Sequence, residues 1–169
     1  MTARLLLALM LGLLLAGCGF HLRGQADMPF STLYLKVPNE HSDFAVELKR
    51  SLAANGVRLA AKPEEAEMTL VIDSEGVQQK ILSLAATGRA QEYQLLFVVV
   101  LHSYDKQHSE WMPTQTVVAR REYSYSDSVL LAKQEESQTL IQDMQRDMVQ
   151  QILRRLSVSH AHPHGTTEP

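Results

Sequence analysis

The stretch from Tyr93 to Tyr104 constrains the fold more than any other part of this chain, because both of its alternating faces are apolar. One face carries Tyr93, Leu95, Phe97, Val99 and Leu101, and the other carries Leu96, Val98 and Val100. A strand with two apolar faces is typical of the interior of a sheet. We therefore expect this strand to be central. Its second face lies either under a further covering element or under long side chains of neighbouring strands, and the pattern leaves both open.

Periodicity elsewhere in the chain predicts three more strands and two helices. The strands are expected over 32–37, from Met68 past a bulge or bend at Gly76 to Ile81, and over 115–125, with a hairpin tip at Thr87-Gly88 and only a short extension over 57–61. The helices are expected over 42–55 and 140–156, and the stretch 127–136 is ambiguous. For the first helix, Ser42 or Asp43 is placed to cap the start, and Asn55-Gly56 to end it in a left-handed turn.

This order of elements predicts an α+β fold, in which two helices pack on one face of a mixed four-stranded sheet in the order β-α-β-β-β-α. The first two strands are joined through a helix, so we expect them to lie parallel.

The N-terminal segment has the pattern of a bacterial lipoprotein leader. An apolar run from Leu5 to Leu15 has the length of a secretory leader and is too short to cross a bilayer. It ends in Leu15-Ala16-Gly17-Cys18, where small residues precede the single Cys of the chain. We expect residues 1–17 to be removed and Cys18 to carry the lipid. An ordinary secretory leader with a chance Cys is the alternative.

The rest of the chain divides into three parts. Residues 18–31 are interpreted as the lipidated N-terminus and a tether, 32–157 as one α+β domain, and 158–169 as a loose tail containing His160, His162 and His164. The formal net charge of −3 gives no basic field to attract nucleic acid, so no nucleic-acid partner is expected. With a single Cys no disulfide can form within the chain.

No enzyme activity is expected, because the sequence lacks the common catalytic patterns. It contains no Gly-x-Ser-x-Gly, no His-Glu-x-x-His and no phosphate-binding Gly-rich loop. His102 and His108 are interpreted as surface residues. The three His of the tail have no acidic or Cys partner nearby, so we predict neither a metal site nor another cofactor.

Four segments carry a resemblance to a known family. They are Leu15-Ala16-Gly17-Cys18, then Cys18-Gly19-Phe20-His21-Leu22-Arg23, then the turn at Thr87-Gly88 leading into Glu92-Tyr93-Gln94, and finally Leu131-Ala132-Lys133. In order and spacing they resemble the LPS-assembly lipoprotein LptE family. The second segment is more specific than the first, because lipidation chemistry requires neither His21 nor Arg23. The His-containing tail has no counterpart in the resemblance.

The resemblance implies an outer-membrane lipoprotein held at the periplasmic side by its N-terminal lipid. Members of the family partner the β-barrel protein LptD as a plug, aid its assembly and contact lipopolysaccharide during its insertion at the cell surface. A stand-alone periplasmic scaffold or ligand-binding lipoprotein without a barrel partner is the alternative function.

Lipopolysaccharide carries phosphates, so a contact with it should use basic side chains. Lys133 and Arg89 are the first candidates, because they lie in segments that resemble the family. Arg120 and Arg121 are second choices. For each of the four, a solvated surface charge is the alternative interpretation.

Overall fold

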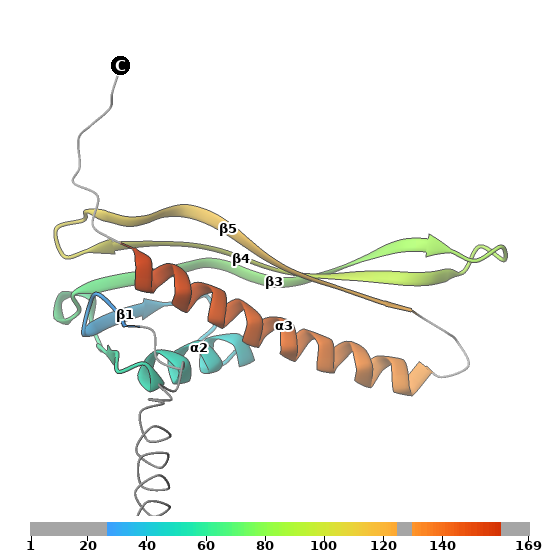
Figure 1. Cartoon of the computed structure of the whole chain (residues 1–169), viewed down its shortest axis with the longest axis horizontal. Helices are drawn as coiled ribbons and strands as arrows, with labels where there is room; N and C mark the ends of the chain where they lie inside the picture. Colours follow the sequence, from blue (N-terminus) through green and yellow to red (C-terminus); the bar gives the residue numbers. More distant parts are fainter. Residues whose placement is uncertain (1–26, 125–129, 160–169) are drawn as a thin grey trace, which may run out of the picture.

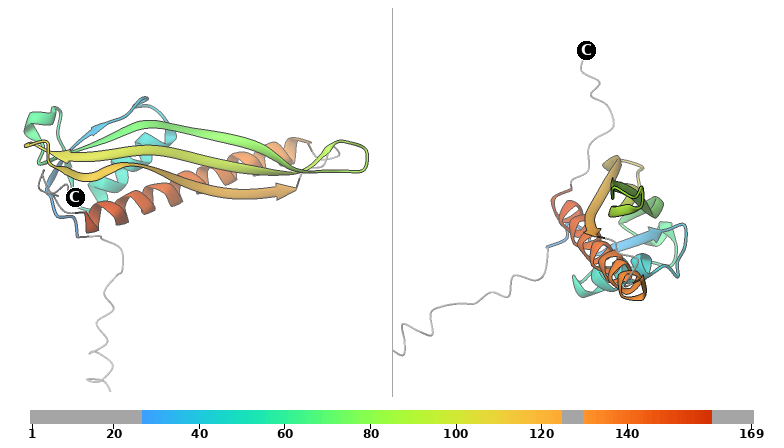
Figure 2. Two further views of the ribbon diagram at one scale, coloured as in Figure 1. Left: turned by 90° about the horizontal axis from the view of Figure 1, so that it is seen from above. Right: turned by 90° about the vertical axis from the view of Figure 1, so that its right-hand side faces the viewer.

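The computed structural model describes residues 27–124 and 130–159, with residues 130–133 described by their backbone only. The predicted leader, Cys18 and the three His of the tail lie outside these residues. The elements in chain order are β1 (Thr32–Lys36), α2 (Asp43–Ala54), β2 (Arg58–Leu59), the short 3-10 helix η1 (Pro63–Glu65), β3 (Met68–Leu84), β4 (Ala90–Asp105), β5 (Glu110–Ser124) and α3 (Leu130–Val158). Both long helices lie on one face of the sheet, as predicted (Figures 1 and 2).

The sheet has five strands in the order β2-β1-β3-β4-β5, so the prediction of four strands is wrong. The additional strand β2 forms two parallel pairs with β1, Thr32 with Arg58 and Leu33 with Leu59. Two exposed residues are too few to give an alternating pattern, and their strand conformation comes from pairing with β1. The predicted parallel arrangement of β1 and β3 is confirmed.

Strand β4 is the interior strand that the two apolar faces predict. It pairs antiparallel with β3 on one side and with β5 on the other, although β3 holds the middle place in the sheet. A chain of this length in strand conformation spans roughly 50 Å. The turn to β3 contains Gly88 at φ 79°, which confirms the predicted hairpin tip.

The sequence predicts a bulge or bend at Gly76, and the bulge is wrong, because Gly76 pairs in register with Val98. The irregularities of β3 fall instead between Ile72 and Ser74 and from Ile81 to Leu84. Strand β5 also begins earlier than predicted, at Glu110, and includes Pro113. Pro is tolerated there because β5 is an edge strand and the register shifts between Leu101 and Ser103 of its neighbour.

Helix α2 begins and ends where the sequence predicts. The Ser42 hydroxyl accepts a hydrogen bond of 3.1 Å from the backbone N–H of Ala45, which makes Ser42 rather than Asp43 the N-cap. Gly56, at φ 79°, follows the C-cap Asn55 in the left-handed conformation.

Helix α3 is longer than its predicted apolar stripe, because it begins at Leu130 within the ambiguous segment. Its C-terminal half closes the core through the fully buried Met144, Met148, Ile152 and Leu156. Residues 134–136 are exposed, so the first turns of α3 extend beyond that core. Among the described residues, no helix is both long enough and apolar enough to cross a membrane.

The second apolar face of β4 lies on the side of the sheet that carries no helix. Leu96 is 7% exposed there and has the long side chains Gln78 and Arg120 as its cross-strand neighbours. Val98 is half-buried, and Val118 opposite it is 43% exposed. Long neighbouring side chains therefore shield part of this face, and no helix of the described residues covers it.

Candidate functional site

The predicted basic residues come from three different elements, and the first of them is Arg89 in the β3–β4 turn. The backbone N–H of Ala85 donates to the Arg89 carbonyl at 2.8 Å, and the backbone N–H of Gly88 donates to the Ala85 carbonyl at 2.8 Å. These bonds close the turn and leave the Arg89 side chain exposed at the far end of the hairpin. The turn thus presents a cation at a projecting point of the molecule (Figure 1).

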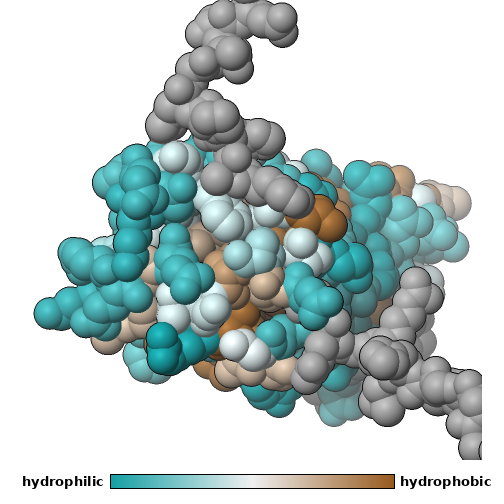
Figure 3. Space-filling view, turned by 60° about the vertical axis from the view of Figure 1, so that its left-hand side comes forward, coloured by the Kyte–Doolittle hydropathy of each residue, from teal (hydrophilic) through white to brown (hydrophobic). Residues whose placement is uncertain are grey.

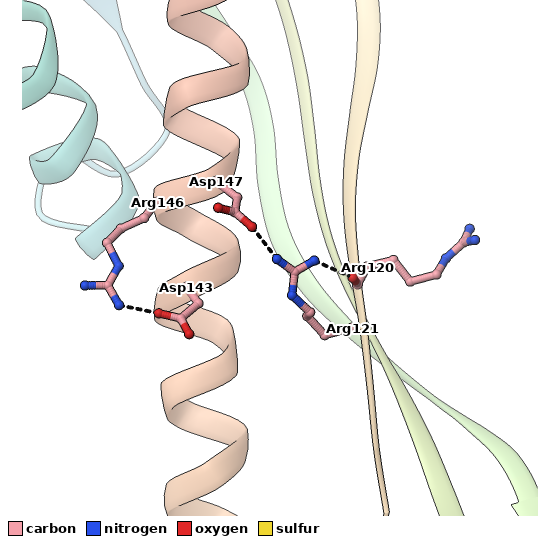
Figure 4. Close-up of polar contacts among 5 residues, drawn as sticks. All are labelled: Arg120, Arg121, Asp143, Arg146 and Asp147. Carbon is pink, nitrogen blue, oxygen red and sulfur yellow. Dashed lines mark hydrogen bonds and ion pairs between the residues drawn. The ribbon is translucent and has the colours of Figure 1, made fainter. Parts of the chain in front are cut away.

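Arg120 and Arg121 are neighbours in β5, and their side chains point to opposite faces of the sheet (Figure 4). The Arg121 guanidinium forms an ion pair with Asp147 of α3 and donates to the Arg120 carbonyl at 2.9 Å. Arg120 points away from α3, and its guanidinium has no ion-pair partner among the described residues. Arg121 therefore ties β5 to α3, whereas Arg120 remains available to a ligand on the helix-free face.

Lys133 lies in the first turns of α3, and its side chain is outside the described residues. The helix begins towards the end of the molecule that carries the β3–β4 turn (Figures 1 and 2). The backbone of Lys133 and the turn of Arg89 thus belong to the same end, as a shared ligand would require. Arg121 is engaged with α3, so the four predicted residues do not form one cluster.

A second polar group, at the opposite end of the sheet, was missed by the sequence reasoning. The His102 ring nitrogen Nδ1 lies 2.8 Å from an Asp73 carboxylate oxygen. The rings of His102 and Tyr104 stack with centroids 6.0 Å apart, and those of Tyr104 and His108 with centroids 5.5 Å apart. Strand alternation places His102 and Tyr104 on one face, but the bulge near Asp73 and the turn at His108 are not visible as periodicity.

A cavity of about 390 Å³ lies beside this ring stack. Its lining consists of Pro63, Glu64, Thr69, Tyr104, Asp105, Lys106 and His108. At this end of the molecule, hydrophilic surface surrounds a smaller apolar area (Figure 3). The cavity mixes both charge signs with aromatic walls, which suits a small polar molecule but selects no particular one.

Asp105 holds the β4–β5 turn together. Burial by itself would raise the pKa of its carboxyl group, but hydrogen bonds from the Ser109 and Gln107 backbone N–H groups and the Trp111 indole act the other way. Together they keep the pKa of Asp105 below its ordinary value of 3.8.

Replacing Asp105 by Asn should therefore lower stability most near neutral pH. A depressed pKa contributes stability above the ordinary pKa of 3.8, and this contribution is lost as pH falls through the folded-state pKa. The difference in Tm between the wild type and Asp105→Asn should narrow steadily as the pH falls below about 4. Thermal unfolding followed by circular dichroism across this range checks it. Glu110→Gln, which removes an exposed carboxylate from the same hairpin, is the matched control, and equal pH dependence of both variants would contradict the assignment.

Among the described residues, no three His, Cys, Asp or Glu side chains gather as metal ligands would. The tail with His160, His162 and His164 lies outside these residues.

Comparison with known proteins identifies relatives over nearly the whole chain. A family model described as "LptE: Lipopolysaccharide-assembly" matches residues 30–156. The LPS-assembly lipoprotein LptE of Yersinia pestis (strain Pestoides F) is 31% identical over 164 residues, which cover 92% of this chain and 77% of that protein. The corresponding protein of Yersinia pseudotuberculosis serotype O:1b (strain IP 31758) matches with the same identity and coverage.

Solved structures show the same fold. Lipoprotein B from Nitrosomonas europaea has a TM-score of 0.70 and 33% identity, covering 82% of this chain and 90% of that one. The minor lipoprotein from Acinetobacter baumannii has a TM-score of 0.65 at 24% identity, covering 80% and 98%. The rare lipoprotein B from Shewanella oneidensis has a TM-score of 0.65 at 22% identity, covering 73% and 91%. At identities below 25% the last two bear on the fold alone.

Proposed function

Because this chain belongs to the LptE family of lipopolysaccharide-assembly lipoproteins, we propose that it partners an LptD-type β-barrel as a plug and contacts lipopolysaccharide during insertion at the cell surface. The family supports the coarser role, that of a Gram-negative outer-membrane lipoprotein in lipopolysaccharide transport. The single observation that carries the proposal is the family match, which spans the folded domain from residue 30 to residue 156. In this role the chain acts by binding, without chemical catalysis.

The placement of the first described residues supports an anchored plug. Phe30, near the start of the described residues, packs edge-on against Trp111 at a centroid distance of 6.1 Å. Trp111 stands at the start of β5, at the opposite end of the sheet from the turn that carries Arg89. A lipid on Cys18 would therefore hold the end of the sheet that carries Trp111 near the inner leaflet. The β3–β4 hairpin would then project away from the membrane. We propose the periplasmic side of the outer membrane for this anchor.

For the lipopolysaccharide contact we propose Arg89 and Lys133, with Arg120 as an additional cation. Arg89 and Arg120 are exposed, and phosphate groups form charge-assisted hydrogen bonds with such side chains. Arg121 is the weakest of the four candidates, because binding a phosphate would have to replace its ion pair with Asp147. Assembly of the barrel would use the same domain as a template around which the barrel folds.

Gentle detergent extraction followed by affinity purification of the tagged, full-length chain tests the partnership. We expect one very large outer-membrane β-barrel protein to co-purify in a stoichiometric amount. Depletion of the chain should shift that barrel to a misassembled or degraded form, which separates an assembly role from a passive plug. A chain that elutes without the barrel would contradict the partnership and favour the stand-alone periplasmic lipoprotein.

A further inference from the structure

The side of β3 that faces β1 is paired along only part of its length. Strand β1 pairs with β3 only from Leu33 opposite Met68 to Lys36 opposite Val71. Beyond that point, from Asp73 to Leu84, the described residues supply β3 with a neighbour on the β4 side only. Only the first part of this long strand is therefore interior, and the longer part, from Asp73 to Leu84, is an edge among the described residues. An edge presents a row of backbone N–H and C=O groups that a further strand can pair with.

This free edge carries few of the features with which proteins block unwanted strand pairing, because its register shifts lie at its two ends and Glu75 and Lys80 are the only charged residues from Ser74 to Ile81. Four of the eight exposed large apolar side chains in the described part of the chain lie here, and they are Val77, Ile81, Leu82 and Leu84. The segment 74–84 contains no proline, and Lys80 is its only basic residue. An exposed apolar edge of this length is a pairing site rather than an ordinary surface.

The opposite edge of the sheet provides an internal comparison. Strand β5 carries Pro113 and the charged residues Arg120, Arg121 and Glu122. It is also tied to α3 by the ion pair of Arg121 with Asp147. Proline and charge are the usual means of protecting an edge strand. The two edges of one sheet thus differ, and only that of β3 is left suitable for a partner.

Gly76 leaves room for a partner at the start of the free edge. A Cβ atom added at Gly76 would have nothing within 4 Å, so the glycine satisfies no packing need inside the described chain. Its φ is outside the left-handed region, so it satisfies no backbone need either. Glycine inside a strand often marks the close approach of another backbone. The register of β3 with β4 runs without a shift from Ser74 to Ile81, a length typical of one strand.

We propose that the edge from Ser74 to Ile81 accepts an extended segment of the β-barrel partner, which adds a sixth strand to the sheet. The proposal rests on the proposed function for the existence of that partner. A polypeptide fits better than a lipid, because only a peptide backbone matches a row of alternating donors and acceptors, whereas an acyl chain has neither. The exposed Val77 and Ile81 lie four residues apart and therefore on the same face of the strand. There they would contact apolar side chains at alternating positions of the added strand.

Hydrogen exchange on the co-purified complex and on the free chain tests strand addition directly. We expect alternate backbone amides between Ser74 and Ile81 to exchange at least 100-fold more slowly in the complex, because only every second amide of an edge strand points outward. Unchanged exchange along this edge within an intact complex would overturn strand addition and leave the partnership standing. If no β-barrel protein co-purifies with the wild-type chain, both the partnership and the strand addition would be overturned. The exchange of these amides in the free chain could also become slower as the concentration of the chain rises. That result would identify a second copy of the chain as the occupant of the edge and would also overturn the proposal.

A pair of matched variants provides an independent measurement. Val77→Lys combined with Ile81→Lys places two charges on side chains that are 42% and 57% exposed. Val118→Lys combined with Val46→Lys adds the same charge at positions that are 43% and 54% exposed. We expect the first pair to reduce the yield of the complex at least tenfold and the second to leave it unchanged, with both retaining the wild-type Tm. Equal yields from the two variants would overturn the proposal.

Discussion

A chain that reaches the periplasm through an ordinary cleavable leader and carries Ser in place of Cys18 is expected to leave the membrane fraction. Each buried methylene of an acyl chain contributes about 0.8 kcal/mol, so two or more chains on Cys18 hold a protein firmly at a membrane. Even a single acyl chain gives a binding constant of about 10⁴ M⁻¹, so without any chain the association with lipid vesicles should fall below what flotation detects.

Flotation of vesicles mixed with the purified proteins measures this loss, and mass spectrometry of the native chain provides the direct check. The native protein should begin at Cys18 and carry fatty acids on its thiol and its amine. Gly19→Ala in the native chain is the control that should retain the lipid. A native protein that keeps residues 1–17, or one that is cleaved but lacks fatty acids, would contradict the assignment of the leader.

The double charge reversal Arg89→Glu with Lys133→Glu should weaken binding to purified lipopolysaccharide by at least about tenfold. A hydrogen bond to a charged group contributes about 1.5–3 kcal/mol, and exposure to solvent reduces this for each residue. Two lost contacts and the new repulsion of phosphate together exceed the 1.4 kcal/mol that corresponds to a factor of ten. The Tm should change little, because Arg89 is exposed at a turn.

The matched control is Arg58→Glu with Lys106→Glu. These two basic residues are also exposed and lie at the other end of the sheet, so the control changes the net charge equally. Equilibrium binding at two ionic strengths should separate a local contact from a general effect of charge. Wild-type affinity of the folded double variant, or an equal loss in the control, would reject Arg89 and Lys133 as the site.

The features that sequence reasoning predicted correctly depend on neighbours in the chain. Helix α2 is capped by Ser42 and ends at Gly56, because both ends satisfy backbone groups within a few residues. The apolar stripe of α3 and the two apolar faces of β4 likewise appear as local periods. The exposed position of Arg89 could be predicted for the same reason, because the turn that carries it is formed by residues close in the chain.

The features that sequence reasoning missed depend on partners far away in the chain. Strand β2 exists only because β1 lies beside it, and Pro113 could be placed within a strand only once β5 was known to be an edge. Gly76 suggested a bulge because glycine disrupts strands, yet the register with β4 holds through it. For the same reason, sequence reasoning treated Arg120 and Arg121 alike, and only the position of α3 shows that Arg121 has a partner.

The sequence by itself determined the leader pattern ending at Cys18, the order of the long helices and strands, and the face of each element that is buried. These properties follow from covalent geometry, from the 2.0 and 3.6 periods and from capping, all of which act over short stretches of chain. Only the tertiary structure decided that β1 ends at Lys36 while β3 continues to Leu84, and hence that the described part of the chain leaves most of β3 without a neighbour on the β1 side. Backbone hydrogen bonds between distant segments have no signature in either segment alone, so the unpaired edge becomes visible only when the strands are placed side by side.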